Sequence, residues 1–161
     1  MNLRIRNIVI LFLLIVVGCK KEIYVYEKEF EDEKFYFQYN KSPYTGTCTI
    51  LSSDTSHRVI GIISYKKGVC EGKAIYFHVN GKPKCTGNYK KGNMDGLWKF
   101  WDENGNLTHE ISYKEDQFHG VFKSYYSNGK LKEKGKFNMN KPIGKWIFYS
   151  KDGKVISIKN Y

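Results

Sequence analysis

Residues 96–119 read GLWKFWDENGNLTHEISYKEDQFH, residues 120–143 read GVFKSYYSNGKLKEKGKFNMNKPI, and residues 144–161 read GKWIFYSKDGKVISIKNY. Each copy opens with a glycine, carries Asn-Gly or Asp-Gly in its middle, and has a tyrosine or phenylalanine 17 residues after the opening glycine. Residues 72–95 follow the same pattern, and the unit that starts at residue 46 follows it with two extra residues at its turn. Such a repeat decides the fold, because one copy cannot bury its apolar side without its neighbours.

Each repeat is predicted to be one β-hairpin. Asn-Gly or Asp-Gly between two runs rich in Tyr, Phe, Trp, Ile and Val is a strong hairpin signal, since glycine accepts the left-handed backbone of the turn. We expect a type I turn closed by a glycine bulge, with positive φ at Gly105 and Gly129. This turn pairs an aromatic with an aliphatic residue across each hairpin: Trp101 with Leu107, Tyr125 with Leu131, and Tyr149 with Val155.

The hairpins predict an all-β domain in which stacked antiparallel hairpins form a single extended, twisted sheet. Nine or ten strands at about 4.8 Å spacing would make it about 45 Å long. Because long twisted sheets curl, one face is expected to close around a core while the other stays partly open. The strand within residues 154–161 is expected to be an open edge whose lysines discourage edge-to-edge pairing.

The first 18 residues, MNLRIRNIVILFLLIVVG, have the organisation of an export signal. Arg4 and Arg6 precede an apolar run over residues 8–17, which is too short to span a bilayer. Gly18 and Cys19 then resemble the end of a bacterial lipoprotein signal, in which the cysteine is lipidated and becomes the new N-terminus. We therefore expect an exported protein, lipid-anchored to a membrane of the cell envelope through Cys19. An ordinary secretory signal is the alternative.

Charge divides the rest of the chain. Residues 19–34 form an acidic tether, and residues 35–161 form the repeat domain, with a half-unit before the unit at residue 46. The whole chain has 27 basic and 16 acidic residues, for a net charge of +11. A basic surface keeps a domain soluble, and it also attracts anionic lipid headgroups or acidic polymers. We expect no nucleic-acid partner, because an exported protein rarely meets nucleic acid.

Aromatic residues and lysines supply the candidate binding residues. Surfaces that combine aromatic rings with cations suit carbohydrate, peptide or lipid-headgroup contacts. The same aromatic residues would also serve as the packed core of a thin sheet. The candidate binding aromatics are Trp98, Trp101, Tyr125, Trp146 and Tyr149, and the candidate basic strip is Lys130, Lys132, Lys134 and Lys136.

The sequence carries no recognisable catalytic or metal-binding constellation. Its four histidines occupy four different positions of the repeat, and the repeat's acids fall at predicted turns, where carboxylates cap or face solvent. Cys70, His78 and Cys85 do not have the spacing of a zinc site. We therefore expect no enzyme activity, no metal and no cofactor. With Cys19 lipidated, Cys48, Cys70 and Cys85 remain, which permits one disulfide at most or three buried thiols.

The repeat resembles the bacterial variant of the MORN repeat. The resemblance covers roughly residues 35–161 and rests on Gly-x-Trp/Phe followed by an aromatic residue, then Asn-Gly-x-Leu, then a closing tyrosine. Ala74 and Ser124 depart from it where it has aromatic residues. Proteins of this family are often described as toxin–antitoxin antitoxins of the YwqK type.

The resemblance implies a β-hairpin scaffold used for contacts with proteins or membranes. We expect a membrane-anchored, non-enzymatic scaffold that binds a partner protein through these repeats. One alternative is a basic module that binds anionic membrane lipid or cell-wall polymer. Another is an antitoxin-like protein that neutralises its partner, although export fits badly with a cytoplasmic toxin.

Overall fold

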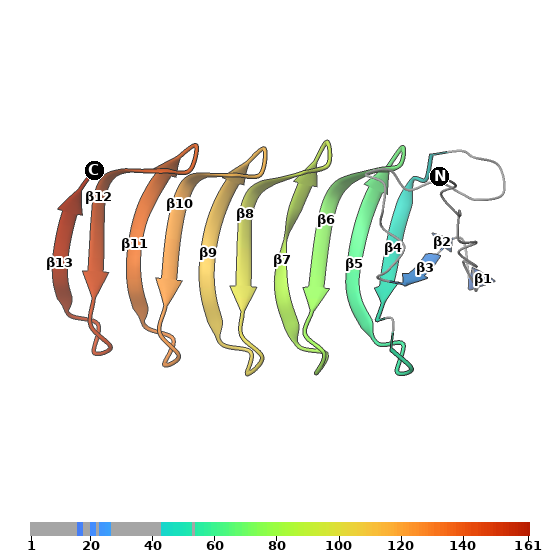
Figure 1. The fold of residues 1–161 in the computed structure, drawn as a ribbon, viewed down its shortest axis with the longest axis horizontal. Coiled ribbons are helices and arrows are strands. Elements are labelled where there is room, and N and C mark those ends of the chain that lie inside the picture. Colours follow the sequence, from blue (N-terminus) through green and yellow to red (C-terminus); the bar gives the residue numbers. More distant parts are fainter. Residues whose placement is uncertain (1–15, 18–19, 22, 27–42, 53) are drawn as a thin grey trace, which may run out of the picture.

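The computed structural model describes residues 16–17, 20–21, 23–26, 43–52 and 54–161 (Figure 1). Cys19, most of the acidic tether and the half-unit up to residue 42 lie outside the described residues, as does most of the expected export signal. Within the described ranges the chain forms strands and turns and no helix. The predicted all-β class is therefore confirmed.

Ten strands, β4 to β13, follow one another in a single antiparallel sheet, each hydrogen-bonded to the strand before it (Figure 1). A short strand, β3, joins this sheet parallel to β4, and β1 and β2 form a separate pair. The strands are β1 Val16–Val17, β2 Lys20–Lys21, β3 Ile23–Tyr26, β4 Gly46–Leu51, β5 Val59–Lys66, β6 Val69–Phe77, β7 Pro83–Lys90, β8 Asn93–Trp101, β9 Leu107–Lys114, β10 Gln117–Tyr125, β11 Leu131–Asn138, β12 Lys141–Tyr149 and β13 Val155–Asn160.

The predicted hairpin register is confirmed at all three turns. The pairs across the turns are Trp101 with Leu107, Tyr125 with Leu131, and Tyr149 with Val155. Gly105 and Gly129 have φ values of 90° and 79°, as the bulged turn requires. The Gly105 amide donates to the carbonyl oxygen of Asp102 at 2.9 Å, which closes the turn. These turns lie along the lower edge of the sheet in Figure 1.

A second set of turns, at the opposite edge, joins each hairpin to the next. Both residues of each turn have φ between 49° and 90°, the type I′ conformation whose twist matches that of the strands. Neighbouring turns are linked by hydrogen bonds: the Asn140 amide donates to the Phe118 carbonyl oxygen, and the Phe118 amide donates to the Asn140 Oδ1. These turns are Lys67-Gly68, Lys91-Gly92, Glu115-Asp116 and Met139-Asn140.

One face of the sheet, here the core face, holds most of the buried residues. The row along its middle runs through successive strands as Ile63, Ala74, Gly87, Trp98, Ile111, Phe122, Gly135 and Trp146. Trp98 is 1% exposed and Trp146 is 5% exposed. Aromatic rings beside the row, such as those of Tyr113 and Phe137, pack edge-on against the two indoles.

The two tryptophans lie directly over glycines of the preceding strand. A Cβ atom at Gly87 would be 2.2 Å from the Trp98 ring, and one at Gly135 would be 2.2 Å from the Trp146 ring. The large and small residues of this row are complementary, so each ring is buried against the strand beside it. The structural period is therefore two hairpins, or 48 residues, rather than one.

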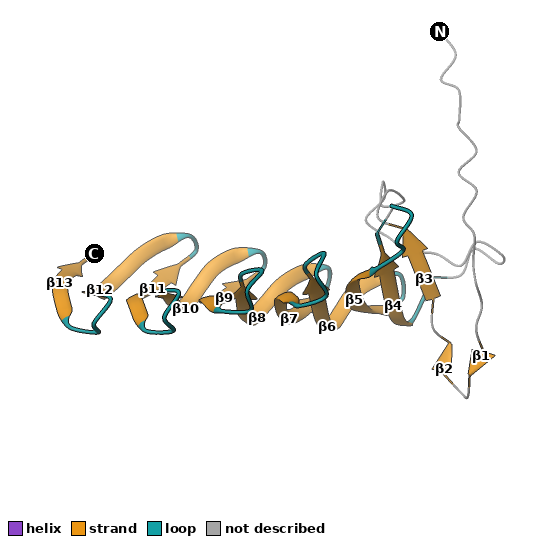
Figure 2. Cartoon of the chain, turned by 90° about the horizontal axis from the view of Figure 1, so that it is seen from below, coloured by secondary structure: helices purple, strands orange, loops and turns teal. Residues whose placement is uncertain are grey.

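The sheet stays open, and the expectation that it curls around a core is wrong. Strands β3 and β13 lie at opposite ends of the sheet, and Figure 2 shows the hairpins set out one after another along its length. Because each indole is covered by the adjacent strand and its neighbouring rings, burial does not require the two ends of the sheet to approach each other.

Candidate functional site

The candidate binding aromatics divide between the two faces of the sheet. Trp98 and Trp146 are core residues with almost no exposed surface. Trp101, Tyr125 and Tyr149 are only half-buried and lie on the opposite face, here the outer face. Successive residues of a strand point to opposite faces, so Trp98 and Trp101, three residues apart, cannot share one.

The three outer-face rings belong to an apolar row that we call the outer ridge. They come from β8, β10 and β12, so they recur at every second strand, at intervals of about 10 Å. Aliphatic residues on the intervening strands face them across the turns. The outer ridge consists of Trp101, Leu107, Tyr125, Leu131, Tyr149 and Val155.

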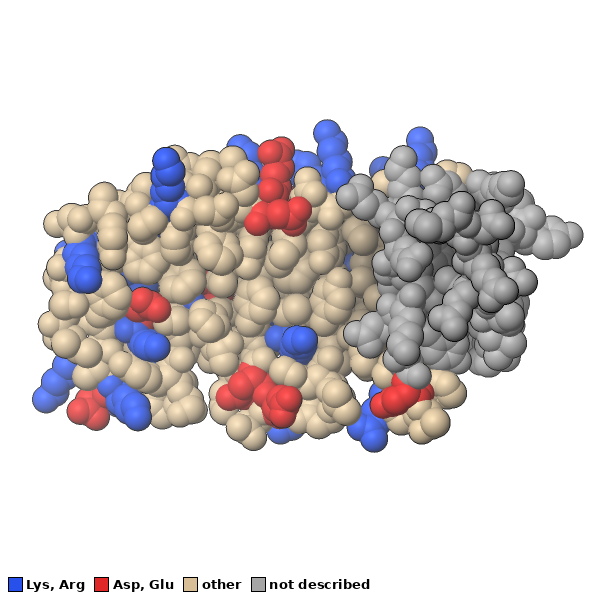
Figure 3. Space-filling model, in the orientation of Figure 1, with Lys and Arg blue, Asp and Glu red and all other residues tan. Residues whose placement is uncertain are grey.

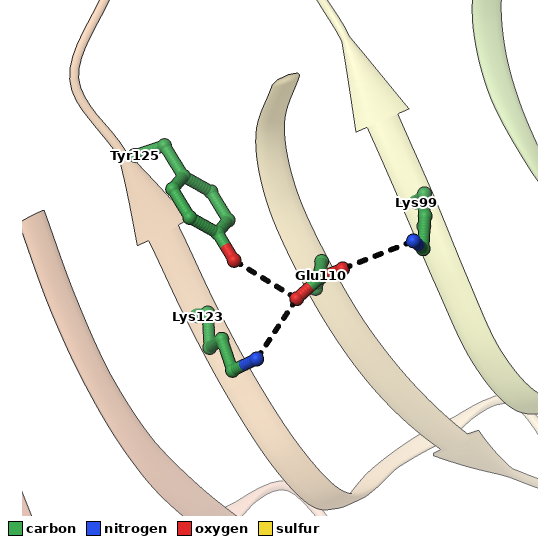
Figure 4. Close-up of polar contacts among 4 residues, drawn as sticks. All are labelled: Lys99, Glu110, Lys123 and Tyr125. Carbon is green, nitrogen blue, oxygen red and sulfur yellow. Dashed lines mark hydrogen bonds and ion pairs between the residues drawn. The ribbon is translucent and has the colours of Figure 1, made fainter. Parts of the chain in front are cut away.

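A charged row runs beside the outer ridge and is centred on Glu110 (Figure 4). The Glu110 carboxylate accepts from Lys99 Nζ at 3.2 Å, from Lys123 Nζ at 3.1 Å and from the Tyr125 hydroxyl at 2.9 Å. Its side chain is 13% exposed. Burial opposes its ionisation, but these hydrogen bonds outweigh burial and hold the pKa of Glu110 below its ordinary value. Burial and the bond to Glu110 raise the pKa of Tyr125 to about 12.

This cluster is a structural device more than a reactive one. Glu110 ties Tyr125 to β9 and neutralises two lysines that would otherwise repel each other across the sheet. Sequence reasoning missed it, although Lys99, Glu110 and Lys123 occupy directly opposed positions once the predicted hairpin register is extended to the next turn. The cluster fixes one ring of the outer ridge in place.

The four lysines of the candidate basic strip lie in three settings. Lys134 and Lys136 are exposed on the outer face, and Lys134 Nζ lies 5.7 Å from the centroid of the Tyr149 ring. Lys132 falls at a β-bulge, and its charge acts together with burial to lower the pKa of His109. Lys130 is at the turn, where its Nζ donates to the Asp152 carbonyl oxygen at 3.0 Å. Two exposed cations therefore flank the outer ridge.

The core face is hollowed by a groove of about 830 Å³ over β5 to β7. Its walls include Ile63, Tyr76 and two of the three free thiols, Cys70 and Cys85. Burial raises the pKa of both thiols, and it raises the pKa of Cys48 to about 12. The thiols are thus protonated and weakly nucleophilic at neutral pH, like small apolar residues.

Charged side chains gather mainly along the two turn-bearing edges of the face seen in Figure 3, and a largely uncharged band lies between them. Within the described ranges, no group of three or more His, Cys, Asp or Glu residues is placed so that it could hold a metal ion. The same part of the chain contains no helix that is long and apolar enough to cross a membrane.

Comparison with known families gives one match. The family model described as the MORN repeat variant matches residues 71–91, 94–115, 118–139 and 142–161. Each matched segment begins inside the first strand of a hairpin and extends through its second strand, from β6–β7 to β12–β13. No curated protein is significantly similar to the chain.

Proposed function

Because the chain belongs to the MORN repeat variant family, whose repeats suggest a role in binding proteins or lipids, we propose that it is a membrane-anchored, non-enzymatic scaffold that binds a partner protein. The partner contacts the outer ridge, and Lys134 and Lys136 contribute to the rim of the contact. A lipid anchor at Cys19 holds the scaffold at a membrane of the bacterial cell envelope.

The outer ridge is the observation that carries this proposal. Protein interfaces are enriched in aromatic residues near their centre and have a polar rim. The outer ridge supplies three half-buried rings and three aliphatic residues from six successive strands, with two exposed lysines beside it. Tyr125 is held by Glu110, so it loses little conformational freedom on binding.

The alternative role, binding of anionic lipid or cell-wall polymer by the basic face, is less well supported. Such binding draws on clusters of uncompensated lysines. In the charged row, Lys99 and Lys123 are already paired with Glu110. An antitoxin-like activity would be a special case of partner binding and would use the same outer ridge, but export argues against a cytoplasmic toxin as the partner.

Lipidation is tested by Cys19→Ala in the full-length chain. The wild-type protein should fractionate with membranes as a processed, acylated species, and Cys19→Ala should remain unprocessed or become soluble. Mass spectrometry of the N-terminal peptide checks acylation directly. A membrane-bound species of mature size from Cys19→Ala would contradict the lipid anchor.

Partner binding is tested by cross-linking the anchored protein in intact cells and identifying the captured envelope proteins. The double variant Trp101→Ala/Tyr149→Ala should lose the wild-type partner. Val79→Ala, which truncates a 67% exposed apolar residue away from the outer ridge, should keep it. If the double variant captures the same protein as efficiently, or if only anionic vesicles bind and no protein does, the scaffold proposal is wrong.

A further inference from the structure

Strand β13 lies at the edge of the sheet and is exposed along its whole length. Val155, Ile156 and Ile158 are 56%, 64% and 50% exposed, whereas Ile111 of β9, which is flanked by strands on both sides, is 8% exposed. Among the described strands, β13 pairs with β12 alone. An apolar strand with one free edge is a ready template for an added strand.

The ladder between β12 and β13 shows which backbone groups face the free edge. Gly144 and Tyr161 exchange two hydrogen bonds, each 3.0 Å long. Because bonded and non-bonded pairs alternate along an antiparallel ladder, Lys159 and Ser157 also point toward β12. The amide and carbonyl groups of Ile158 and Asn160 therefore point away from the sheet, toward an incoming strand.

The side chains around this edge are basic. Residues 141–161 contain five lysines and a single acid, Asp152. Neither ion pair among the described residues involves these lysines. Lys159, opposite Trp146 in the ladder, lies on the core face with its Nζ 5.8 Å from the Phe148 ring centroid, and Ile158 lies opposite Ile147 on the outer face. One face of the edge is thus cationic and the other apolar.

We propose that the free edge of β13 accepts an extended segment of a partner protein in which apolar and acidic residues alternate. The segment adds a strand to the sheet through the outward groups of Ile158 and Asn160. Its apolar side chains lie beside Ile158 on the outer face, and its acidic side chains lie beside Lys159 on the core face. The proposal rests on the proposed role in protein binding and names a second contact surface for it.

A second copy of the chain fits this edge less well. Antiparallel pairing of β13 with itself would bring the basic hairpins of both copies together, with Asp152 as the one acid that each contributes. Like charges on paired strands are destabilising. Charge complementarity therefore favours an acidic segment.

The test uses the full-length protein in detergent and two labelled peptides of about six residues, the usual length of a strand. One peptide alternates valine with glutamate, and the other alternates valine with lysine. Fluorescence anisotropy should show saturable binding of the glutamate peptide alone. Asn160→Pro removes an outward amide and should weaken binding by about tenfold or more, whereas Asn160→Ala keeps that amide and should bind as the wild type does.

Two controls keep the outcome decisive. Lys159→Glu should reverse the preference between the peptides, and circular dichroism should show that Asn160→Pro keeps its strands. Equal binding of both peptides, unchanged binding by Asn160→Pro, or a wild-type dimer in sedimentation that Asn160→Pro dissociates would each overturn the proposal. Failure here with an intact cross-link to the outer ridge would leave the scaffold function standing, while loss of that cross-link alone would not explain peptide binding at β13.

Discussion

The substitution Gly135→Ala is expected to destabilise the repeat domain by about 2–3 kcal/mol, because overpacking a well-filled core costs this much. Its Cβ atom would lie 2.2 Å from a carbon of the Trp146 ring, while ordinary contacts are at least 3.4 Å. The indole would have to move by about 1 Å, yet Phe122 and Phe137 hold it at centroid distances of 5.4 Å and 5.1 Å. Gly135 does not have a left-handed φ, so the expected effect is steric.

Thermal and urea unfolding, followed by tryptophan fluorescence, measure this effect. A loss of 2–3 kcal/mol should lower Tm by about 5–10 °C in a chain of this size. Gly61→Ala is the matched control, since its Cβ would have a nearest contact of 3.3 Å, and it should cost about 1 kcal/mol or less. Adding Trp146→Phe should recover part of the loss, as coupled sites are non-additive. Equal destabilisation by Gly135→Ala and Gly61→Ala would refute the reasoning.

Trp98→Phe should cost about 1 kcal/mol more than Trp146→Phe in urea unfolding, because Trp98 Nε1 donates to the Asn88 carbonyl oxygen at 3.1 Å while the buried Trp146 Nε1 has no partner among the described residues. Met139→Asn should raise stability by about 0.5 kcal/mol, a gain that Met139→Ala should not share, because Met139 has φ of 49° in a type I′ turn that favours asparagine. The folded-state pKa of Glu110 is lowered, so its contribution to stability is present above its ordinary pKa of 4.5 and is lost as the pH falls through the folded value. Glu110→Gln should therefore lower the free energy of unfolding at neutral pH and flatten its decline in acid; an unchanged acid limb would contradict this.

Local sequence rules were enough to predict the hairpins. The Asn-Gly and Asp-Gly turns fix the register, and the pairs at Trp101, Tyr125 and Tyr149 follow from them because the side-chain period of a strand is two residues. The turns at the opposite edge were harder to find. Lys91-Gly92 carries a glycine, but Glu115-Asp116 and Met139-Asn140 have no glycine to mark their left-handed backbone.

The candidate site was predicted in its composition and not in its geometry. Sequence reasoning grouped Trp98 and Trp146 with Trp101, although the strand period places them on opposite faces. The pairing of Gly87 with Trp98, and of Gly135 with Trp146, joins adjacent repeats and has twice the period of the sequence pattern. A search for a 24-residue repeat averages that alternation away.

The placement of tryptophan over glycine also limits how a chain of this kind can change in length. Loss of residues 96–143 would bring Trp146 to the strand after Gly87, so the same large and small residues would meet again. Loss of residues 120–143 alone would instead set Trp146 against Ile111, where the cradle for the indole is missing. Duplication or deletion of single hairpins thus generates mismatched seams, and evolutionary growth of the array is expected to proceed in pairs.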